Sequence, residues 1–461
     1  MSAARDRLAR VVNAYVSRRL QPLQDELAGS RAEVRELRAQ VDALNSSLAE
    51  TRSALMSTLN MLSRRGNIDG PVRCLFLVHY MEAWDSLGDV YTEMYKSDDF
   101  QPIVASIPRR LVHAPDFGQE ELTHQRLEAL GVPHIRLQGP DSFRDLDTVK
   151  QLDPHLIFRQ SQWDADVPPA FATDHLSFAR LALVPYETMS LIEAAPPPPG
   201  IRDWLTDTPY HRNCWAVFCA NEYVRDIAAG RSVATNGEQF VVTGHPKVTR
   251  IRRAAQQAPA RPRPFTVLWS AHHSLDDEWS RFGTFHLVHE QMLDWAAAMP
   301  EWHFVFSPHP SLTSRMNAAH PPLTTQMVES FRARWAALPN TTTFLGDAGG
   351  GYADMFAVSD VLVSDGLSLL LEYQIANKPV VFLERVDHRP FSPMGDIAQR
   401  GFHTVATVPD ARAIVGRFAA GEPDPLAPMQ REVVQELFGE HDPAREIVDH
   451  IRAHWRDEAT G

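Results

Sequence analysis

The sequence has 461 residues, of which 44% are hydrophobic, and it carries a formal net charge of −13. This length leaves room for two domains of ordinary size and an extension. The acidic balance argues against nucleic acid as the main partner. The chain has no apolar run of about 18 residues, so we expect no membrane-spanning helix, and its beginning lacks the apolar core of a secretory signal.

The cysteines indicate the redox setting. Three residues, Cys74, Cys214 and Cys219, cannot form a closed disulfide framework, so we expect a reducing environment. Cys214 and Cys219 do not have the spacing of a redox CxxC pair, and we interpret both as packing residues. The predicted localisation is therefore cytoplasmic, with the inner face of the cytoplasmic membrane left open by the beginning of the chain.

Residues 1–65 show the pattern of a long helix. Leucine or valine occupies seven consecutive a positions of a heptad, namely Leu20, Leu27, Val34, Val41, Leu48, Leu55 and Leu62. Further d positions hold Leu23, Leu37 and Leu44. This spacing predicts a coiled coil that joins copies of the chain through residues 20–62, with dimer, trimer and tetramer all open. The alternative is a helix folded back on its own domain.

The first 20 residues differ from the rest of this helix because they are basic. Five arginines against Asp6 leave a charge of +4 beside several apolar side chains. A basic amphipathic helix can lie on anionic lipid, so we expect peripheral membrane contact through residues 1–20. The alternative is the solvated start of the coiled coil.

Residues 71–255 have the pattern of a first α/β domain. Short buried strands are predicted at 72–78, 100–107, 156–158, 181–184, 216–219 and 239–242. Helical stretches between them give the alternation of a parallel, Rossmann-like sheet. Asp164-Ala-Asp166 matches a metal-binding DxD motif. Its Pro-rich loop supplies no further ligands, so we interpret it as a turn.

A Pro-rich linker at 255–264 precedes a second α/β domain at 264–425. Its strands are predicted at 265–270, 302–306, 342–345, 361–363 and 380–383. Residues 426–461 close the chain with helices at about 428–438 and 443–456. Two Rossmann-like domains joined by one linker predict the GT-B arrangement, with a cleft between two facing sheet edges.

The stretch from Ser359 to Phe382 carries the strongest functional signal of the chain. It reads as a buried strand, a polar turn and a helix N-terminus, and Ser364, Asp365, Gly366 and Ser368 form the turn. Backbone N–H groups at such a turn bind phosphate at the carboxyl edge of an α/β sheet. Glu372, one turn into the helix, is placed to accept hydrogen bonds from a ribose diol.

Histidines follow two other strands of the second domain. Strand 265–270 runs into His272 and His273, and strand 302–306 runs into His309. Histidine at this edge can neutralise phosphate as a cation or accept a hydroxyl proton as a neutral base. The neighbouring polar and turn residues Ser270, Ser274 and Pro310 complete the expected donor site. We expect no zinc site, because no cysteine joins the cluster.

At this point the chain resembles a known family. Trp269-Ser-Ala-His-His-Ser274, Phe306-Ser-Pro-His309-Pro310 and the segment from Ser359 through Lys378-Pro379 are similar to the donor-domain motifs of CDP-glycerol:poly(glycerophosphate) glycerophosphotransferases. In the first domain, Glu82-Ala-Trp-Asp85-Ser-Leu87, Leu183-Val-Pro185-Tyr186 and Val242-Thr-Gly244-His-Pro246-Lys247 agree. The resemblance covers roughly residues 72–420.

The resemblance implies that His309 and the Asp365–Ser368 turn contact the pyrophosphate of a nucleotide-activated donor, with CDP-glycerol favoured and no separate cofactor. The chain departs from the family at one place. Members carry a His-Gly-Thr-Pro motif whose histidine is a candidate base, whereas this chain reads Val184-Pro185-Tyr186-Glu187-Thr188. Glu187 is the candidate base here.

Three functions remain open. The first is a metal-independent transferase that moves glycerol phosphate, or a similar polyol phosphate, from a CDP-linked donor to a glycan or lipid-linked surface acceptor. The second is a GT-B glycosyltransferase that uses a nucleotide-activated sugar in surface polysaccharide synthesis. The third is a coiled-coil scaffold with a degenerate transferase domain, against which the intact His309-Pro310 and Asp365–Ser368 motifs argue.

Overall fold

The computed structural model describes residues 19–21, 26–42, 44–45, 48, 70–110, 116–193, 196–197, 200–232, 234–258, 263–275, 280–345 and 351–457. The chain divides into two compact units, Met1–Ser63 and Arg64–Gly461, and each is described by itself. In the described ranges, no helix combines the length and the apolar character needed to cross a membrane.

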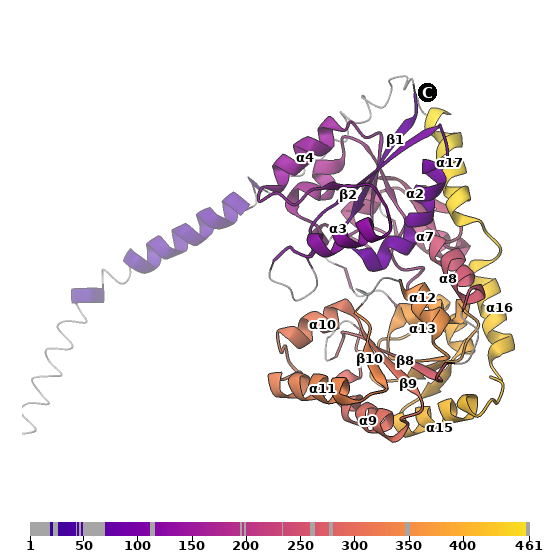
Figure 1. Cartoon of the computed structure of the whole chain (residues 1–461). Helices are drawn as coiled ribbons and strands as arrows, with labels where there is room; N and C mark the ends of the chain where they lie inside the picture. Colours follow the sequence, from indigo (N-terminus) through magenta and orange to yellow (C-terminus); the bar gives the residue numbers. More distant parts are fainter. Residues whose placement is uncertain are drawn as a thin grey trace, which may run out of the picture. The chain divides into compact units, whose positions relative to one another are not determined.

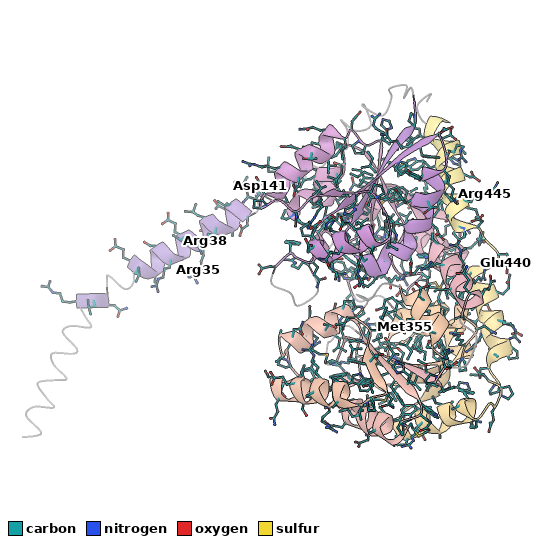
Figure 2. All side chains as sticks on the ribbon, in the orientation of Figure 1. Arg35, Arg38, Asp141, Met355, Glu440 and Arg445 are labelled. Carbon is teal, nitrogen blue, oxygen red and sulfur yellow. The ribbon has the colours of Figure 1, made fainter. Side chains whose placement is uncertain are left out.

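The N-terminal unit is helical at every residue described (Figure 1). The predicted a positions that are described, Leu20, Leu27, Val34, Val41 and Leu48, are all exposed. Arg35 and Arg38 project from the same helix (Figure 2). Leu23, Leu55, Leu62 and the basic residues before position 19 lie outside the described residues. The coiled coil and the membrane contact therefore stay predictions.

The first sheet of the main unit has seven parallel strands in the order β3-β2-β1-β4-β5-β6-β7. The strands are β1 Val72–Val78, β2 Phe100–Ser106, β3 Ile135–Arg136, β4 Leu156–Arg159, β5 Arg180–Leu183, β6 Cys214–Cys219 and β7 Phe240–Val242. The helices are α2 Gly88–Tyr95, α3 Glu120–Ala129, α4 Ser142–Gln151, α5 Thr173–Leu176, α6 Pro209–Asn213, α7 Glu222–Arg231 and α8 Pro246–Gln256, with 3-10 turns η1 Met81–Ser86, η2 Asp164–Asp166 and η3 Pro169–Phe171.

The second sheet has six parallel strands in the order β10-β9-β8-β11-β12-β13. The strands are β8 Thr266–Ala271, β9 His303–Pro308, β10 Thr341–Thr343, β11 Val361–Ser364, β12 Val380–Leu383 and β13 His403–Val405. The helices are α9 Phe285–Ala298, α10 Pro310–Asn317, α11 Thr325–Ala337, α12 Tyr352–Val358, α13 Leu367–Ile375, α14 Pro393–Ala398 and α15 Val408–Ala419, with the 3-10 turn η4 Gln399–Gly401.

The predicted fold class is confirmed: two parallel sheets stand in sequence, each flanked by helices. The central strands are near-continuous apolar runs because helices cover both faces of a parallel sheet. All eleven predicted strands are present within a few residues of the expected bounds. Two strands, β3 and β13, were not predicted. They lie at the sheet edges, and their residues, Ile-Arg and His-Thr-Val, contain no apolar run.

The last two helices connect both domains. Helix α16 (Ala427–Phe438) packs on α13 in the second domain, and α17 (Pro443–Asp457) packs on α2 and α8 in the first. Figure 1 shows α17, in yellow, running beside α2. Ile447, Ile451 and Trp455 join the core that β1 and β4 form. The chain therefore returns to its first domain to complete that core.

Helix α8 of the first domain also packs on α12 and α13 of the second. Lys247 Nζ on α8 donates to Glu372 Oε1 on α13 at 3.1 Å, and both side chains are almost fully buried. Arg250 binds Asp354 on α12 at 2.9 Å. These contacts hold the two sheets with their carboxyl ends toward one cavity.

Candidate functional site

A cavity of about 450 Å³, here called the central cavity, lies where the carboxyl ends of the two sheets meet. The first domain supplies residues that follow β1, β2, β4 and β5, among them Tyr80, Arg109, Trp163, Tyr186 and Glu187. The second domain supplies residues that end or follow β8, β9 and β11, among them Ser270, His272, His273, His309, Gly366 and Ser368. Open α/β sheets bind ligands at this edge.

Three of the predicted catalytic residues, His272, His273 and His309, form one cluster in this cavity. The ring centroids of His272 and His273 lie 4.5 Å apart, and that of His309 lies 4.6 Å from His273 and 5.4 Å from His272. The cluster follows from topology, because β8 and β9 are parallel neighbours with Ala271 beside Pro308. Residues that follow adjacent parallel strands at the same end of the sheet therefore lie close together.

His309 is fixed at the start of α10. Its backbone N–H donates to the Ala271 carbonyl at 2.9 Å, and its Nδ1 accepts from the Ser311 N–H at 3.1 Å. The side chain is therefore the N-cap of α10, a position that helices fill with hydrogen-bond acceptors. Since Nδ1 accepts, the proton of the neutral ring is on Nε2.

His272 is held in the same way by its own loop. Its Nδ1 accepts from the Ser274 N–H at 3.3 Å and lies 2.7 Å from Ser274 Oγ. Its backbone N–H donates to Asp365 Oδ1 at 2.6 Å. Asp365 Oδ2 accepts from Thr284, through both the backbone N–H and Oγ1. Asp365 thus ties the β8 loop to the residue before α9.

Burial sets the charge of these groups. It lowers the pKa of His272 and of His309 well below the usual value, and the neighbouring His273 and Arg109 lower that of His309 further. Burial raises the pKa of Asp365 to about 6 although its hydrogen bonds oppose this. These shifts disfavour a positive charge on either ring, and a neutral ring offers its N–H group as a donor to a ligand.

Two arginines that sequence analysis missed, Arg109 and Arg110, line the central cavity. Arg109 is 7% exposed, its Nε donates to Gln119 at 2.7 Å, and its guanidinium stacks over the Tyr80 ring at 4.5 Å. An ion pair with Glu82 at 3.4 Å completes its contacts. Arg109 is among the charges that lower the pKa of His309. The arginine pair after β2, Arg109-Arg110, was the available signal.

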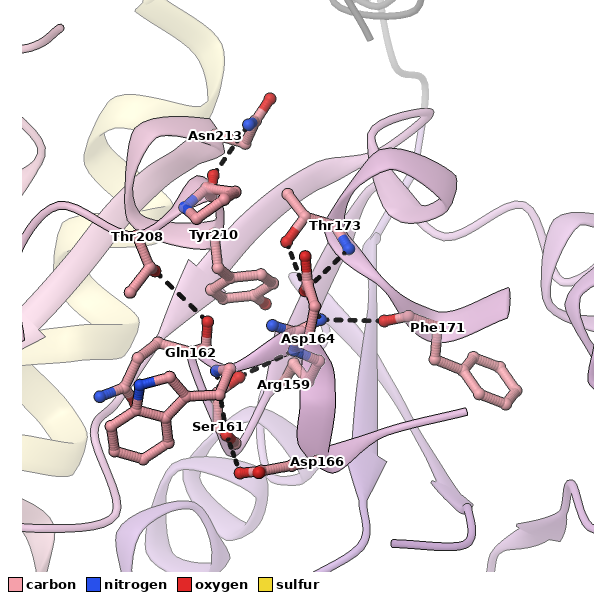
Figure 3. Close-up of polar contacts among 12 residues, drawn as sticks. Arg159, Ser161, Gln162, Asp164, Asp166, Phe171, Thr173, Thr208, Tyr210 and Asn213 are labelled. Atoms are coloured by element: carbon pink, nitrogen blue, oxygen red, sulfur yellow. Dashed lines mark hydrogen bonds and ion pairs between the residues drawn. The ribbon is translucent and has the colours of Figure 1, made fainter. Parts of the chain in front are cut away.

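An aromatic wall lies on the first-domain side of the central cavity. The Tyr186 ring meets Tyr80 edge-on at 5.7 Å and Trp163 at 5.8 Å. Trp163 lies in the loop after β4, and Arg159, the last residue of β4, holds this loop. Arg159 is fully buried and donates to the Ser161 carbonyl at 2.8 Å (Figure 3).

The predicted turn at Asp164–Asp166 is part of the hydrogen-bond network around Arg159 and Ser161. Asp164 Oδ1 accepts from Arg159 and Thr173, and Asp166 Oδ2 accepts from Ser161 Oγ (Figure 3). Both carboxylates are therefore used structurally. In the described part of the chain, no group of three or more His, Cys, Asp or Glu side chains is arranged to hold a metal ion.

Glu187, the predicted base, lines the central cavity from the loop after β5. That loop is anchored by His245, whose Nε2 lies 2.8 Å from the Pro185 carbonyl and whose Nδ1 accepts from the Lys247 N–H. Burial raises the pKa of Glu187 to about 7, with Lys247 opposing and Glu372 adding to the shift. A carboxyl group with this pKa can accept a proton at neutral pH.

The remaining predicted donor residues lie behind the cavity surface. Ser364 Oγ accepts from the Gly366 N–H, and Ser274 Oγ accepts from Phe282. Pro310 is the first residue of α10. Glu372, expected to meet a ribose, is instead 2% exposed and paired with Lys247. The roles of these residues in binding stay predictions.

A second cavity of about 650 Å³, here called the side cavity, lies beside β6, β7 and the loop after β5, and reaches α7 and α14. Its lining includes Gln162, Thr188, Met189, Phe240 and Met394. Glu187 is the residue that lines both cavities. The side cavity was not predicted, because its wall joins loops that are far apart in the sequence.

Comparisons with known proteins find similarity in structure alone. No protein-family profile matches the chain, and no curated protein sequence matches it. The UDP-GlcNAc 2-epimerase of Neisseria meningitidis, bound to UDP-GlcNAc, has a TM-score of 0.54 at 13% identity over 83% of this chain and 100% of the epimerase. S. aureus MnaA with UDP gives 0.53 at 13% identity, over 84% and 97%.

The wall teichoic acid polymerase TagF is another structural neighbour. Its TM-score is 0.52 at 12% identity, and the match covers 92% of this chain and 99% of TagF. A TagF variant soaked with CDPG matches over 90% and 99% with the same TM-score. Similarity at this identity shows the fold. The GT-B arrangement expected from the sequence, and shared with the teichoic acid polymerases, is thereby confirmed.

Proposed function

We propose that this protein transfers glycerol phosphate, or a similar polyol phosphate, from a CDP-linked donor to a surface-glycan or teichoic-acid-like acceptor. The observation that carries the proposal is that the histidine cluster and two arginines, Arg109 and Arg110, line the same central cavity. N–H donors, guanidinium groups and the N-terminus of α13 together suit a pyrophosphate. The fold shared with TagF supports this reading.

In this reaction the acceptor hydroxyl oxygen bonds to the β-phosphorus of the donor while the bond from that phosphorus to the bridging oxygen breaks. CMP leaves, and the hydroxyl proton passes to Glu187. Nε2–H groups of His272 and His309, with Arg109, stabilise the charge that develops on the phosphates. Preorganised donors of this kind are a large term in catalysis.

A second function is supported by other structural neighbours. The epimerase and MnaA hold UDP-GlcNAc and UDP on the same fold. A glycosyltransferase that uses a nucleotide-activated sugar would need the same contacts to the pyrophosphate. The acceptor would then attack an anomeric carbon, and the nucleotide, a diphosphate or CMP according to the donor, would leave. The two functions differ in the donor that binds.

Isothermal titration calorimetry with CDP-glycerol and with UDP-, GDP- and CMP-linked sugars separates these functions. We expect CDP-glycerol to bind, and His309→Ala to weaken its binding by about tenfold or more. His303→Ala is the matched control, because His303 begins the same strand β9 at its opposite end. Binding of an activated sugar in place of CDP-glycerol would favour glycosyl transfer. If none of these donors binds, both proposed functions are wrong.

A further inference from the structure

The side cavity contains two buried polar atoms that lack a protein partner. Gln162 Oε1 and Thr188 Oγ1 have no hydrogen-bond partner among the described residues, and both side chains are 4% exposed. Both residues line the side cavity. Buried polar atoms in native structures are nearly always hydrogen-bonded, because an unpaired one loses its bonds to water. Both atoms are therefore available for hydrogen bonds from a ligand in the side cavity.

The rest of the wall combines apolar and charged side chains. Met189, Ile192 and Met394 contribute apolar surface, and Arg202 and Asp203 are among the charged residues. A wall that combines apolar side chains with many hydrogen-bonding groups suits a sugar or polyol, which has C–H faces and hydroxyl edges. An amide oxygen accepts a hydrogen bond and a threonine hydroxyl can donate or accept one, so two ligand hydroxyls satisfy both.

The side cavity also adjoins the proposed reaction centre. Thr188 follows Glu187 in the chain, and Gln162 precedes Trp163, which lines the central cavity. Glu187 lines both cavities, so a molecule that extends from the side cavity past Glu187 can bring a hydroxyl to the carboxylate and to the donor in the central cavity.

We propose that the side cavity binds the terminal sugar or polyol unit of the acceptor, with Gln162 and Thr188 as the residues that recognise its hydroxyls. The proposal rests on the transferase function and names its acceptor site. One hydroxyl of the bound unit loses its proton to Glu187 and its oxygen bonds to the transferred group, while the nucleotide leaves with the electrons of the broken bond.

Thr188→Val and Gln162→Met test the site, because each removes the polar atoms and keeps about the same volume. We expect each variant to lose about tenfold in acceptor affinity with unchanged CDP-glycerol affinity. The melting temperature should stay equal or rise, because the free protein loses an unsatisfied group. Thr266→Val is the matched control: its buried hydroxyl bonds to the Pro264 carbonyl at 3.1 Å and lies outside both cavities. This control should lower the melting temperature and leave acceptor affinity unchanged.

Saturation-transfer NMR tests binding without turnover. The probes are glycerol, sn-glycerol 3-phosphate, methyl β-glucoside and N-acetylglucosamine. We expect transfer to at least one probe in the wild type, and its loss in both variants. Absence of transfer to all four, or transfer that survives both substitutions, would overturn the proposal. Loss of CDP-glycerol affinity in the variants would also overturn it, since the cavity would then serve the donor.

The two proposals fail in different ways. If no nucleotide donor binds the wild type, the transferase function fails, while polyol binding that depends on Gln162 and Thr188 still supports a hydroxyl-recognising cavity. If donors bind and turn over but both substitutions leave acceptor affinity unchanged, the transferase function is supported. The side cavity is then not the acceptor site.

Discussion

The Nδ1 atoms of His272 and His309 both accept hydrogen bonds from their own loops, and this decides what the two side chains offer a ligand. Each neutral ring keeps its proton on Nε2 and acts as a donor. Burial holds the pKa of both rings below the usual value, so a positive charge on them at pH 7 is disfavoured. Donation to phosphate oxygen therefore needs no change of protonation state.

His309→Ala tests this role. We expect kcat/KM to fall about 100-fold or more, since an electrostatic donor of this kind is lost. His309→Gln should retain more activity, because the glutamine side-chain nitrogen can replace Nε2 as donor. Both variants should be folded, although loss of the N-cap costs about 1 kcal/mol of stability. Steady-state kinetics and thermal melts measure these effects. Equal activity in the alanine and glutamine variants would contradict a donor role.

Glu187 predicts the pH dependence of the reaction. Its pKa is raised to about 7 by burial, and a base must be deprotonated to act. We therefore expect kcat/KM to fall about tenfold for each pH unit below 7 and to level off above it. Glu187→Gln should reduce the rate about 100-fold or more and remove this dependence. An acid limb that persists in the variant would assign the titration to another group.

At the scale of elements, α8 and α13 are joined by the buried pair of Lys247 and Glu372. Lys247 is also one of the charges that oppose the raised pKa of Glu187. The motif Gly244-His245-Pro246-Lys247 therefore has two structural uses: His245 anchors the Pro185 loop, and Lys247 bridges the domains. Neither contact requires the nucleotide.

Lys247→Met should destabilise the protein by about 3 kcal/mol, because it leaves the Glu372 carboxylate buried without a partner. Adding Glu372→Leu should recover most of that loss, since an apolar pair of similar volume carries no buried charge. Urea unfolding measures both. The exposed pair of Arg400 and Glu436 is the control, and Arg400→Met should cost less than about 1 kcal/mol. A similar cost for both single substitutions would mean that burial of the pair adds nothing.

At the scale of the whole molecule, the N-terminal helix has an apolar seam that its own unit leaves exposed. Leu27, Val34, Leu37 and Val41 are each about half exposed or more. Association of several copies would cover this surface, as in a coiled coil. Joining several active sites would raise the local concentration of polymer ends.

Deleting residues 1–65 should convert an oligomer to a monomer in light scattering. Activity on a short soluble acceptor should remain, because both cavities lie in the other unit. Val34→Glu should dissociate the full-length protein, since it puts a charge at an a position. Ala39→Glu, at the outward f position of the same helix, is the matched control and should leave the oligomer intact. A monomeric full-length protein would contradict the coiled coil.

The local pattern of the sequence determined the strands and the edge at which the site lies. Apolar runs followed by His272, His309 or Asp365 predict that these residues leave a parallel sheet at one end. This inference needs only periodicity and the direction of the chain. The edge strands β3 and β13 were not predicted, because their residues, Ile-Arg and His-Thr-Val, contain no apolar run.

Only the tertiary structure decided which polar residues face a ligand and which support the fold. Asp365 and Glu372 stand in the motif as plausible ligands, yet one accepts three hydrogen bonds from His272 and Thr284 and the other pairs with Lys247. Arg109 and the side cavity come from segments distant in the sequence. The physical reason is that hydrogen bonds and burial depend on distance in space, which a local pattern does not contain.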